Sequence, residues 1–97
     1  MKSIFISCNQ ALYDEVQQTM ESLGVRGYTA WEELMGCGTA TGEPHLGSTT
    51  WPTLNSAILS FVEDEQCETL MNALRVIDAN NPQLGLRAFW WSVGGTL

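Results

Sequence analysis

Three short stretches of the chain carry the apolar, β-branched and aromatic residues that suit a β-strand, and along the first of them two sets of residues alternate. In residues 3–8, SIFISC, serine and phenylalanine alternate with isoleucine and cysteine. Residues 53–62, TLNSAILSFV, carry apolar side chains on both faces, and residues 85–93, GLRAFWWSV, are rich in aromatic residues. Each stretch is predicted to form a strand.

Two longer stretches repeat apolar residues every three or four positions, which is the period of an amphipathic helix. The first, residues 11–23, lies between Asn9, a candidate N-terminal cap, and Gly24, a residue typical of a helix end. The second starts with the acidic residues 63–65, which suit a helix N-terminus, and stops before Pro82. Its apolar positions are Cys67, Leu70, Met71, Leu74 and Ile77.

Residues 25–35, VRGYTAWEELM, favour a strand because they contain aromatic and β-branched residues, although the last four, EELM, suit a short helix equally well. With this strand the order becomes β-α-β-β-α-β, the ferredoxin-like pattern. We therefore expect one α+β domain over residues 1–97 with a four-stranded antiparallel sheet and both helices on one face. A long loop, residues 36–52, then connects strands two and three.

Both faces of the expected sheet carry large apolar side chains, although the two helices cover only one face. The strands do not show the regular alternation of a sheet with one face in water. Because an uncovered group of aromatic side chains marks an interaction surface, we expect a homo-oligomer whose sheets pack face inward. The alternative is that some of these side chains lie at strand ends or under the long loop. The two sets are Phe5, Leu59, Phe61, Phe89 and Trp91 on one face, and Ile4, Ile6, Ile58, Val62 and Trp90 on the other.

The loop of residues 36–52, GCGTATGEPHLGSTTWP, is the place where we look for function. It holds four glycines, four threonines and His45, the only histidine of the chain. Loops longer than about 12–15 residues without structure of their own are uncommon in compact domains and are usually functional or disordered.

The charge of the chain narrows the choice of partners. Eleven acidic residues stand against four basic ones, which gives a net charge of −7. This sign is wrong for binding nucleic acid or an anionic membrane surface. No stretch approaches the roughly 20 apolar residues of a membrane span, and the N-terminus lacks the apolar region of a signal peptide. Three cysteines without a CxxC spacing fit a reducing compartment, so we expect a cytoplasmic protein.

The chain resembles the PII-like signalling family and its relatives in the CutA group. The resemblance depends on the element order, the loop position and four stretches: SLGVRGYTAW (22–31), MGCGTATG (35–42), TTWPTLNSAILSFVEDE (49–65) and GLRAFWWSV (85–93). It implies a homotrimer that binds an adenine nucleotide or another small anion in clefts between subunits. The long loop corresponds to the T-loop of that family, which docks on a transporter, an enzyme or a regulator. Residues 36–52 contain no tyrosine to match the one modified in some relatives.

The candidate effector-binding residues lie in the loop and on the last expected strand. Glycines let backbone amides approach an anion, although they serve a flexible hairpin base equally well. An anionic ligand needs one of the few cations, Arg26 or Arg87, unless these are paired with carboxylates. We expect effector contacts from Gly36, Cys37, Gly38, Thr39, Arg87 and Trp90, and partner contacts from Glu43, His45 and Trp51.

Two other functions compete with this regulatory hypothesis. His45 and Glu43, together with Cys37, offer donors for Zn²⁺ or Cu²⁺, and the resemblance to CutA-like proteins implies a role in metal response. Their spacing matches no standard metal-binding motif. A small hydrolase or lyase is the other alternative, but no nucleophile and base are placed together. The sequence therefore favours a non-enzymatic, effector-binding regulator.

Overall fold

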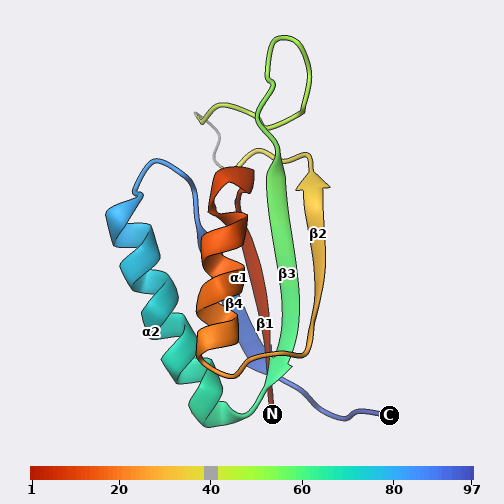
Figure 1. Ribbon diagram of the computed structural model, residues 1–97. Helices are drawn as coiled ribbons and strands as arrows, with labels where there is room; N and C mark the ends of the chain where they lie inside the picture. The colour runs from red at the N-terminus through yellow and green to blue at the C-terminus, as the bar shows by residue number, and fades with distance from the viewer. Residues whose placement is uncertain (39–41) are drawn as a thin grey trace.

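The computed structural model describes residues 1–38 and 42–97 as a sheet with one layer of helices (Figure 1). The element order is the predicted one, and residues 32–34 belong to a strand rather than to a short helix. The strand over residues 3–8 is one residue longer at each end than predicted, because residues 2 and 9 are also paired, and the other three strands are one to three residues shorter at one or both ends. The elements are β1 (Lys2–Asn9), a 3-10 turn η1 (Gln10–Leu12), α1 (Tyr13–Ser22), β2 (Tyr28–Leu34), β3 (Asn55–Val62), α2 (Asp64–Asn80) and β4 (Arg87–Ser92).

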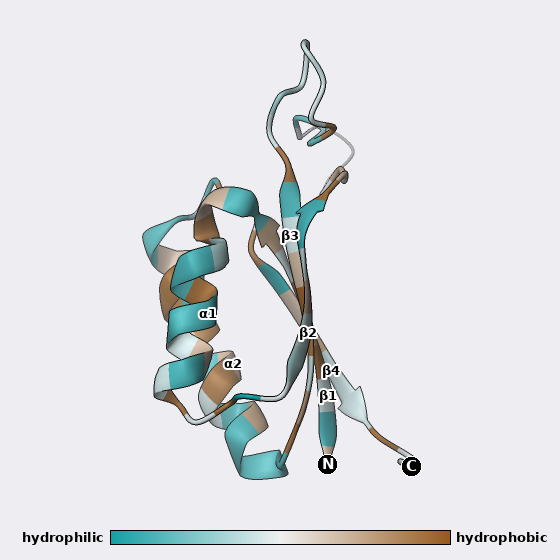
Figure 2. Cartoon of the chain, turned by 45° about the vertical axis from the view of Figure 1, so that its right-hand side comes forward, coloured by the Kyte–Doolittle hydropathy of each residue, from teal (hydrophilic) through white to brown (hydrophobic). Residues whose placement is uncertain are grey.

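The four strands form one antiparallel sheet in the order β2-β3-β1-β4. Ile4 is paired with Ser60 on one side and with Trp90 on the other, and Phe5 is paired with Leu59 and Phe89. Paired residues point to the same face, so this register separates the two apolar sets as predicted. Both helices lie on one face of the sheet, and the other face is bare (Figure 2).

The hydrophobic core fills the space between the sheet and the helices. Ile4, Ile6 and Ile58 from the sheet and Val16, Met20 and Leu70 from the helices are at most 1% exposed. The N-terminus of α2 is held by a capping box, in which the Glu63 amide donates to Gln66 Oε1 at 3.3 Å. The predicted helix start at the acidic run is confirmed.

Replacing Leu70 with Ala is expected to lower the free energy of unfolding by about 2–5 kcal/mol, because it leaves a cavity in this core. Val76 lies on the same helix but is 61% exposed. Val76→Ala should therefore stay within about 0.5 kcal/mol of the wild type. Urea denaturation followed by circular dichroism measures both values, and equal losses for the two variants would contradict the packing described here.

The bare face of the sheet is apolar. Its most exposed members are Phe61 at 55%, Phe89 at 59% and Trp91 at 48%, and Trp31 of β2 lies on the same face by register. We call this surface the open face. Between Phe61 and Trp91 lies Ser3, which is fully buried and whose hydroxyl has no hydrogen-bond partner among the described residues. No described element of the chain covers the open face.

Candidate functional site

A hollow of about 550 Å³ opens at the end of the sheet where the long loop begins. Three segments surround it: the end of β1 together with the start of β3, the loop before β3, and the connection from α2 to β4. We call it the loop-base hollow. The first segment, with the residues just before β3, contributes Ser7, Asn9, Thr53 and Asn55. The loop contributes Gly38, Gly42, Glu43 and His45, and the connection with the start of β4 contributes Pro82, Gln83, Leu84, Gly85 and Arg87.

The base of the loop is pinched together beside this hollow. The backbones of Gly36 and His45 exchange two hydrogen bonds of 2.7 and 2.6 Å. The ring nitrogen Nδ1 of His45 lies 2.5 Å from Oδ1 of Asn55, the first residue of β3. The half-buried His45 is thus held from both sides of the loop. We call Gly36, His45 and Asn55 the pinch.

A glycine at position 36 is required by the packing of the pinch. A Cβ atom there would collide with the side-chain amide of Asn55, whereas a Cβ at Gly38 would meet nothing within 4 Å. Neither residue has a positive φ, so backbone strain does not distinguish them. The close approach of Asn55 is therefore the reason for Gly36.

Gly36→Ala is expected to displace Asn55 and to break its hydrogen bond with His45, at a cost of about 1 kcal/mol in stability. Gly38→Ala should leave this hydrogen bond intact. The ¹H–¹⁵N signals of the His45 ring report the difference by NMR. Identical ring signals in the two variants and the wild type would show that the pinch does not depend on Gly36.

The outer part of the loop, residues 46–54, forms a separate turn beyond the sheet (Figure 1). Its backbone bonds join Gly47 N to Thr53 O at 3.2 Å and Ser48 N to Trp51 O at 2.9 Å. The Trp51 amide also donates to Ser48 Oγ at 3.0 Å. The side chains of Leu46 and Trp51 are 41% and 36% exposed. Leu46 and Trp51 of this outer segment do not line the hollow, whereas Thr53 does.

The α2–β4 connection and the residues just before β3, which form two sides of the hollow, are both attached to the end of β1 and the turn that follows it. The Asn9 amide donates to Leu84 O at 3.2 Å, and the Gln10 amide donates to Leu54 O at 3.0 Å. Gly85, with a φ of 66°, turns the chain into β4. Arg87 follows, exposed, with Nη1 donating to its neighbour Leu86 O at 2.8 Å. The position of the Arg87 guanidinium is thus set by the strand start.

Several of the predicted site residues come together in the structure. Gly38, Glu43, His45 and Arg87 line the loop-base hollow, and Gly36 joins it through the pinch. The Cys37 thiol lies 3.9 Å from the carbonyl oxygen of Gly42. Thr39 lies outside the described residues. Sequence reasoning missed Asn9, Asn55 and Gln83, which the fold brings to the hollow.

Trp90 does not join this group. It is three positions after Arg87 on the same strand, and its pairing with Ile4 puts it on the helix-covered face. There it lines a different hollow between β4 and α2, with the Lys2 ammonium 5.1 Å from its ring centre. Within one chain, Trp90 and Arg87 therefore lie on opposite faces of the sheet. Trp51 lies in the outer segment and not in the hollow.

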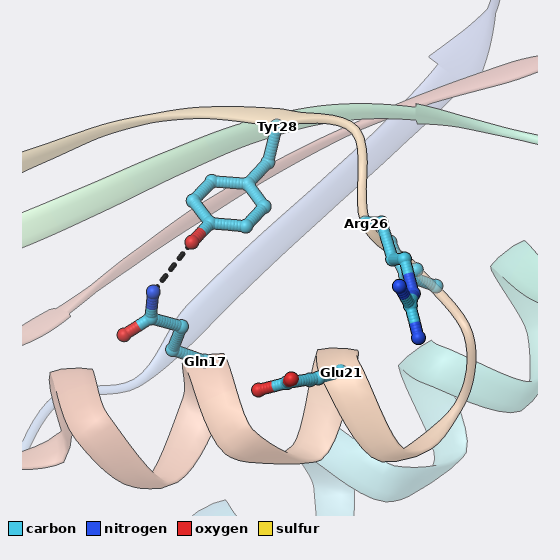
Figure 3. A pocket seen from close by; sticks show the side chains of 5 residues that line it. Gln17, Glu21, Arg26 and Tyr28 are labelled. Atoms are coloured by element: carbon cyan, nitrogen blue, oxygen red, sulfur yellow. Dashed lines mark hydrogen bonds between the residues drawn. The ribbon is translucent and has the colours of Figure 1, made fainter.

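Arg26 is also remote from the loop-base hollow. It lines a small pocket of about 220 Å³ between α1 and β2, together with Gln17, Glu21, Val25 and Tyr28 (Figure 3). In this pocket the Gln17 amide donates to the Tyr28 hydroxyl. Tyr28 is paired with Ser60 and Ser60 with Ile4, whereas Arg87 is paired with Ser7. This pocket therefore lies toward the opposite end of the sheet from Arg87. Arg87 is therefore the one cation among the described residues that line the loop-base hollow.

The cysteines and carboxylates offer little catalytic or metal-binding chemistry. Burial raises the pKa of the Cys8 thiol to about 11 and also raises the pKa of the Cys67 thiol, so both remain protonated near neutral pH. The described residues hold no group of three or more His, Cys, Asp or Glu side chains that could bind a metal ion. Within residues 1–38 and 42–97, no helix is long and apolar enough to cross a membrane.

The structure is a ferredoxin-like βαββαβ protein with a hollow of about 550 Å³ under its β2–β3 loop. The profile of the family described as Nitrogen regulatory protein P-II matches residues 1–91. The chain therefore belongs to the P-II family, whose members are regulatory and non-enzymatic. The alternative of a metal-binding, CutA-like protein is not favoured.

Solved structures of PII-like proteins share the fold. The PII-like protein TTHA0516 of Thermus thermophilus is 21% identical, with a TM-score of 0.68 over 95% of this chain and 85% of that one. CPII, a nitrogen regulatory PII-like protein from Thiomonas intermedia, was solved with ADP, AMP and bicarbonate; it is 19% identical, with a TM-score of 0.71 over 97% of this chain and 88% of that one. Its apo form gives a TM-score of 0.67 at 14% identity, over 95% of this chain and 87% of that one. No curated protein matches the sequence significantly.

Proposed function

We propose that this protein is a PII-like regulator that binds an adenine nucleotide, with or without a second small anion, in the loop-base hollow. The observation that carries the proposal is that one hollow is lined both by the long loop and by the α2–β4 connection with Arg87. A ligand in this position contacts the loop directly. Its binding therefore selects among loop conformations by its different affinity for each of them.

The composition of the hollow supports a nucleotide as the ligand. Arg87 supplies a guanidinium for phosphate, and Gly38 and Gly85 give a ligand close access to the backbone. Amide side chains of Asn9, Asn55 and Gln83 supply donors and acceptors for a ribose or a base. CPII was solved with ADP, AMP and bicarbonate bound, which are ligands of the two classes proposed here, an adenine nucleotide and a small anion.

We also propose that the protein is a homotrimer whose subunits pack through the open face, because PII proteins are usually trimeric. Four large aromatic side chains, Trp31, Phe61, Phe89 and Trp91, are between 42% and 59% exposed there. Covering them removes apolar surface from water at about 25 cal/mol per Å².

The outer segment is the part of the loop that we propose to dock on a partner, such as a transporter or an enzyme in the cytoplasm. Leu46 and Trp51 are exposed there, and exposed tryptophan is a frequent anchor in protein interfaces. Glu43 and His45, the other predicted docking residues, lie lower in the loop, at the hollow. They are positioned to report ligand binding rather than to contact a partner alone.

Isothermal titration of the purified protein with ADP, with and without bicarbonate, tests the proposed function. We expect saturable binding with up to one nucleotide per chain, and chemical-shift changes at His45 when the same titration is followed by NMR. Native mass spectrometry should show trimers that gain nucleotide mass. Absence of binding by ADP and AMP under all these conditions would refute the proposal.

A further inference from the structure

The charge balance of the loop-base hollow is unusual for a site that takes a nucleotide. Arg87 contributes one positive charge and Glu43 contributes one negative charge, and the hollow is lined by no other Lys, Arg, Asp or Glu among the described residues. Residues 39–41, between Gly38 and Gly42, are Thr, Ala and Thr, which carry no charge. The hollow therefore offers almost no net positive charge near neutral pH.

The rest of the chain has few cations to add. Of its four basic residues, Lys2 donates to Ser92 Oγ at 2.9 Å and lies over the Trp90 ring. Arg75 donates to Asn72 Oδ1 at 2.6 Å on α2, and Arg26 lies in the pocket between α1 and β2. A neighbouring copy brings the same four residues together with its own net charge of −7. Association of copies therefore increases the negative field around the site.

From this balance we propose that the hollow selects nucleotides with few phosphates, AMP and ADP over ATP, and that Glu43 is the residue that sets this selection. The inference rests on the proposed function, because it concerns the ligand of the same hollow. Arg87 can pair with one phosphate group in bidentate geometry. Further phosphates extend into a part of the hollow where the described residues of the chain supply no second cation and the Glu43 carboxylate repels them.

The geometry of the loop gives Glu43 this role in particular. Glu43 stands two residues before His45, whose position the pinch fixes through Gly36 and Asn55. The carboxylate is consequently attached to a held part of the loop rather than to its outer segment. It lines the same hollow as Arg87, so a phosphate chain that starts at the guanidinium meets its field.

Glu43 could have the opposite effect on ATP if it bound Mg²⁺, and the experiment must distinguish this role from repulsion of phosphates. A single carboxylate together with nucleotide phosphates is a common arrangement for Mg²⁺. If Glu43 served as such a ligand, Mg²⁺ would increase ATP affinity and the loss of the carboxylate would reduce it. If Glu43 repels phosphates, its loss increases ATP affinity in the absence of metal.

The test is a set of titrations with AMP, ADP and ATP, in EDTA and again with Mg²⁺, on the wild type and on Glu43→Gln. Glu15→Gln is the matched control, because it removes the same charge from an exposed position on α1. In EDTA we expect the wild type to bind ATP at least about tenfold more weakly than AMP, a factor that corresponds to about 1.4 kcal/mol. Glu43→Gln should reduce this ratio severalfold, and Glu15→Gln should leave it unchanged.

Tighter binding of ATP than of AMP in EDTA would overturn the inference while leaving the proposed function intact. So would an unchanged ratio in Glu43→Gln, or an ATP affinity that rises with Mg²⁺ and falls in that variant. Failure of all three nucleotides to bind would instead refute the proposed function and the selection with it. The folding of each variant is checked by its circular dichroism spectrum and its urea midpoint.

Discussion

Arg87→Gln is expected to weaken ADP binding by about 10- to 100-fold, the loss that follows when a hydrogen bond to a charged group worth about 1.5–3 kcal/mol is removed. Arg87 is the only cation that the described residues contribute to the loop-base hollow. Within the same chain no other Lys or Arg takes its place, because Lys2, Arg26 and Arg75 line other pockets. Isothermal titration of wild type and variant measures the change directly.

Arg75→Gln is the matched control for this experiment. It removes the same charge from an exposed position of α2, whose guanidinium bonds to Asn72 and does not line the hollow. Its ADP affinity should equal that of the wild type. Similar losses in both variants would mean that overall charge, and not a contact at position 87, determines nucleotide affinity.

The second large effect concerns assembly. Phe89→Glu is expected to convert the trimer into monomers, because it would place a carboxylate inside the apolar contact that the open face forms in our proposal. Burying an unpaired charge costs several kcal/mol for each subunit. Size-exclusion chromatography with light scattering gives the molar mass of the protein in solution and so counts the chains.

Val76→Glu provides a close control for this variant. Val76 is 61% exposed and Phe89 is 59% exposed, but Val76 lies on α2, in the helix layer on the other side of the sheet. Its substitution should leave the trimer intact. A trimer that survives Phe89→Glu, or one that Val76→Glu also dissolves, would show that the open face is not the surface of assembly.

Most of the fold was predictable because each element carries its own periodic pattern. The stripe from Cys67 to Ile77 has a single helical face, and the capping box at Glu63 and Gln66 starts the helix where the acidic run begins. The two faces of the sheet followed from odd and even positions in β1 and β3. The strand over residues 28–34 was ambiguous because its charged residues suit either structure, and pairing with β3 decided it.

The candidate site was predictable only in part. Loop length indicated residues 36–52, and the scarcity of cations indicated Arg87. Asn9 and Asn55 were not found because nothing in their own sequence neighbourhood marks them; they reach the hollow through the antiparallel register in which Asn9 is paired with Asn55. Trp90 was named as an effector contact together with Arg87, but strand alternation puts the two side chains on opposite faces of the sheet.

The pinch at Gly36, His45 and Asn55 makes the loop modular. The turn beyond His45 closes on itself through the backbone bonds of Gly47 and Ser48, and residues 46–52 do not line the hollow, whereas Thr53 does. Changes of length or sequence within residues 48–51 are therefore expected to leave the hollow below unchanged. One pinched base can in this way carry different tips, and under the proposed function a reporter group attached near Thr50 would follow partner docking without touching the effector.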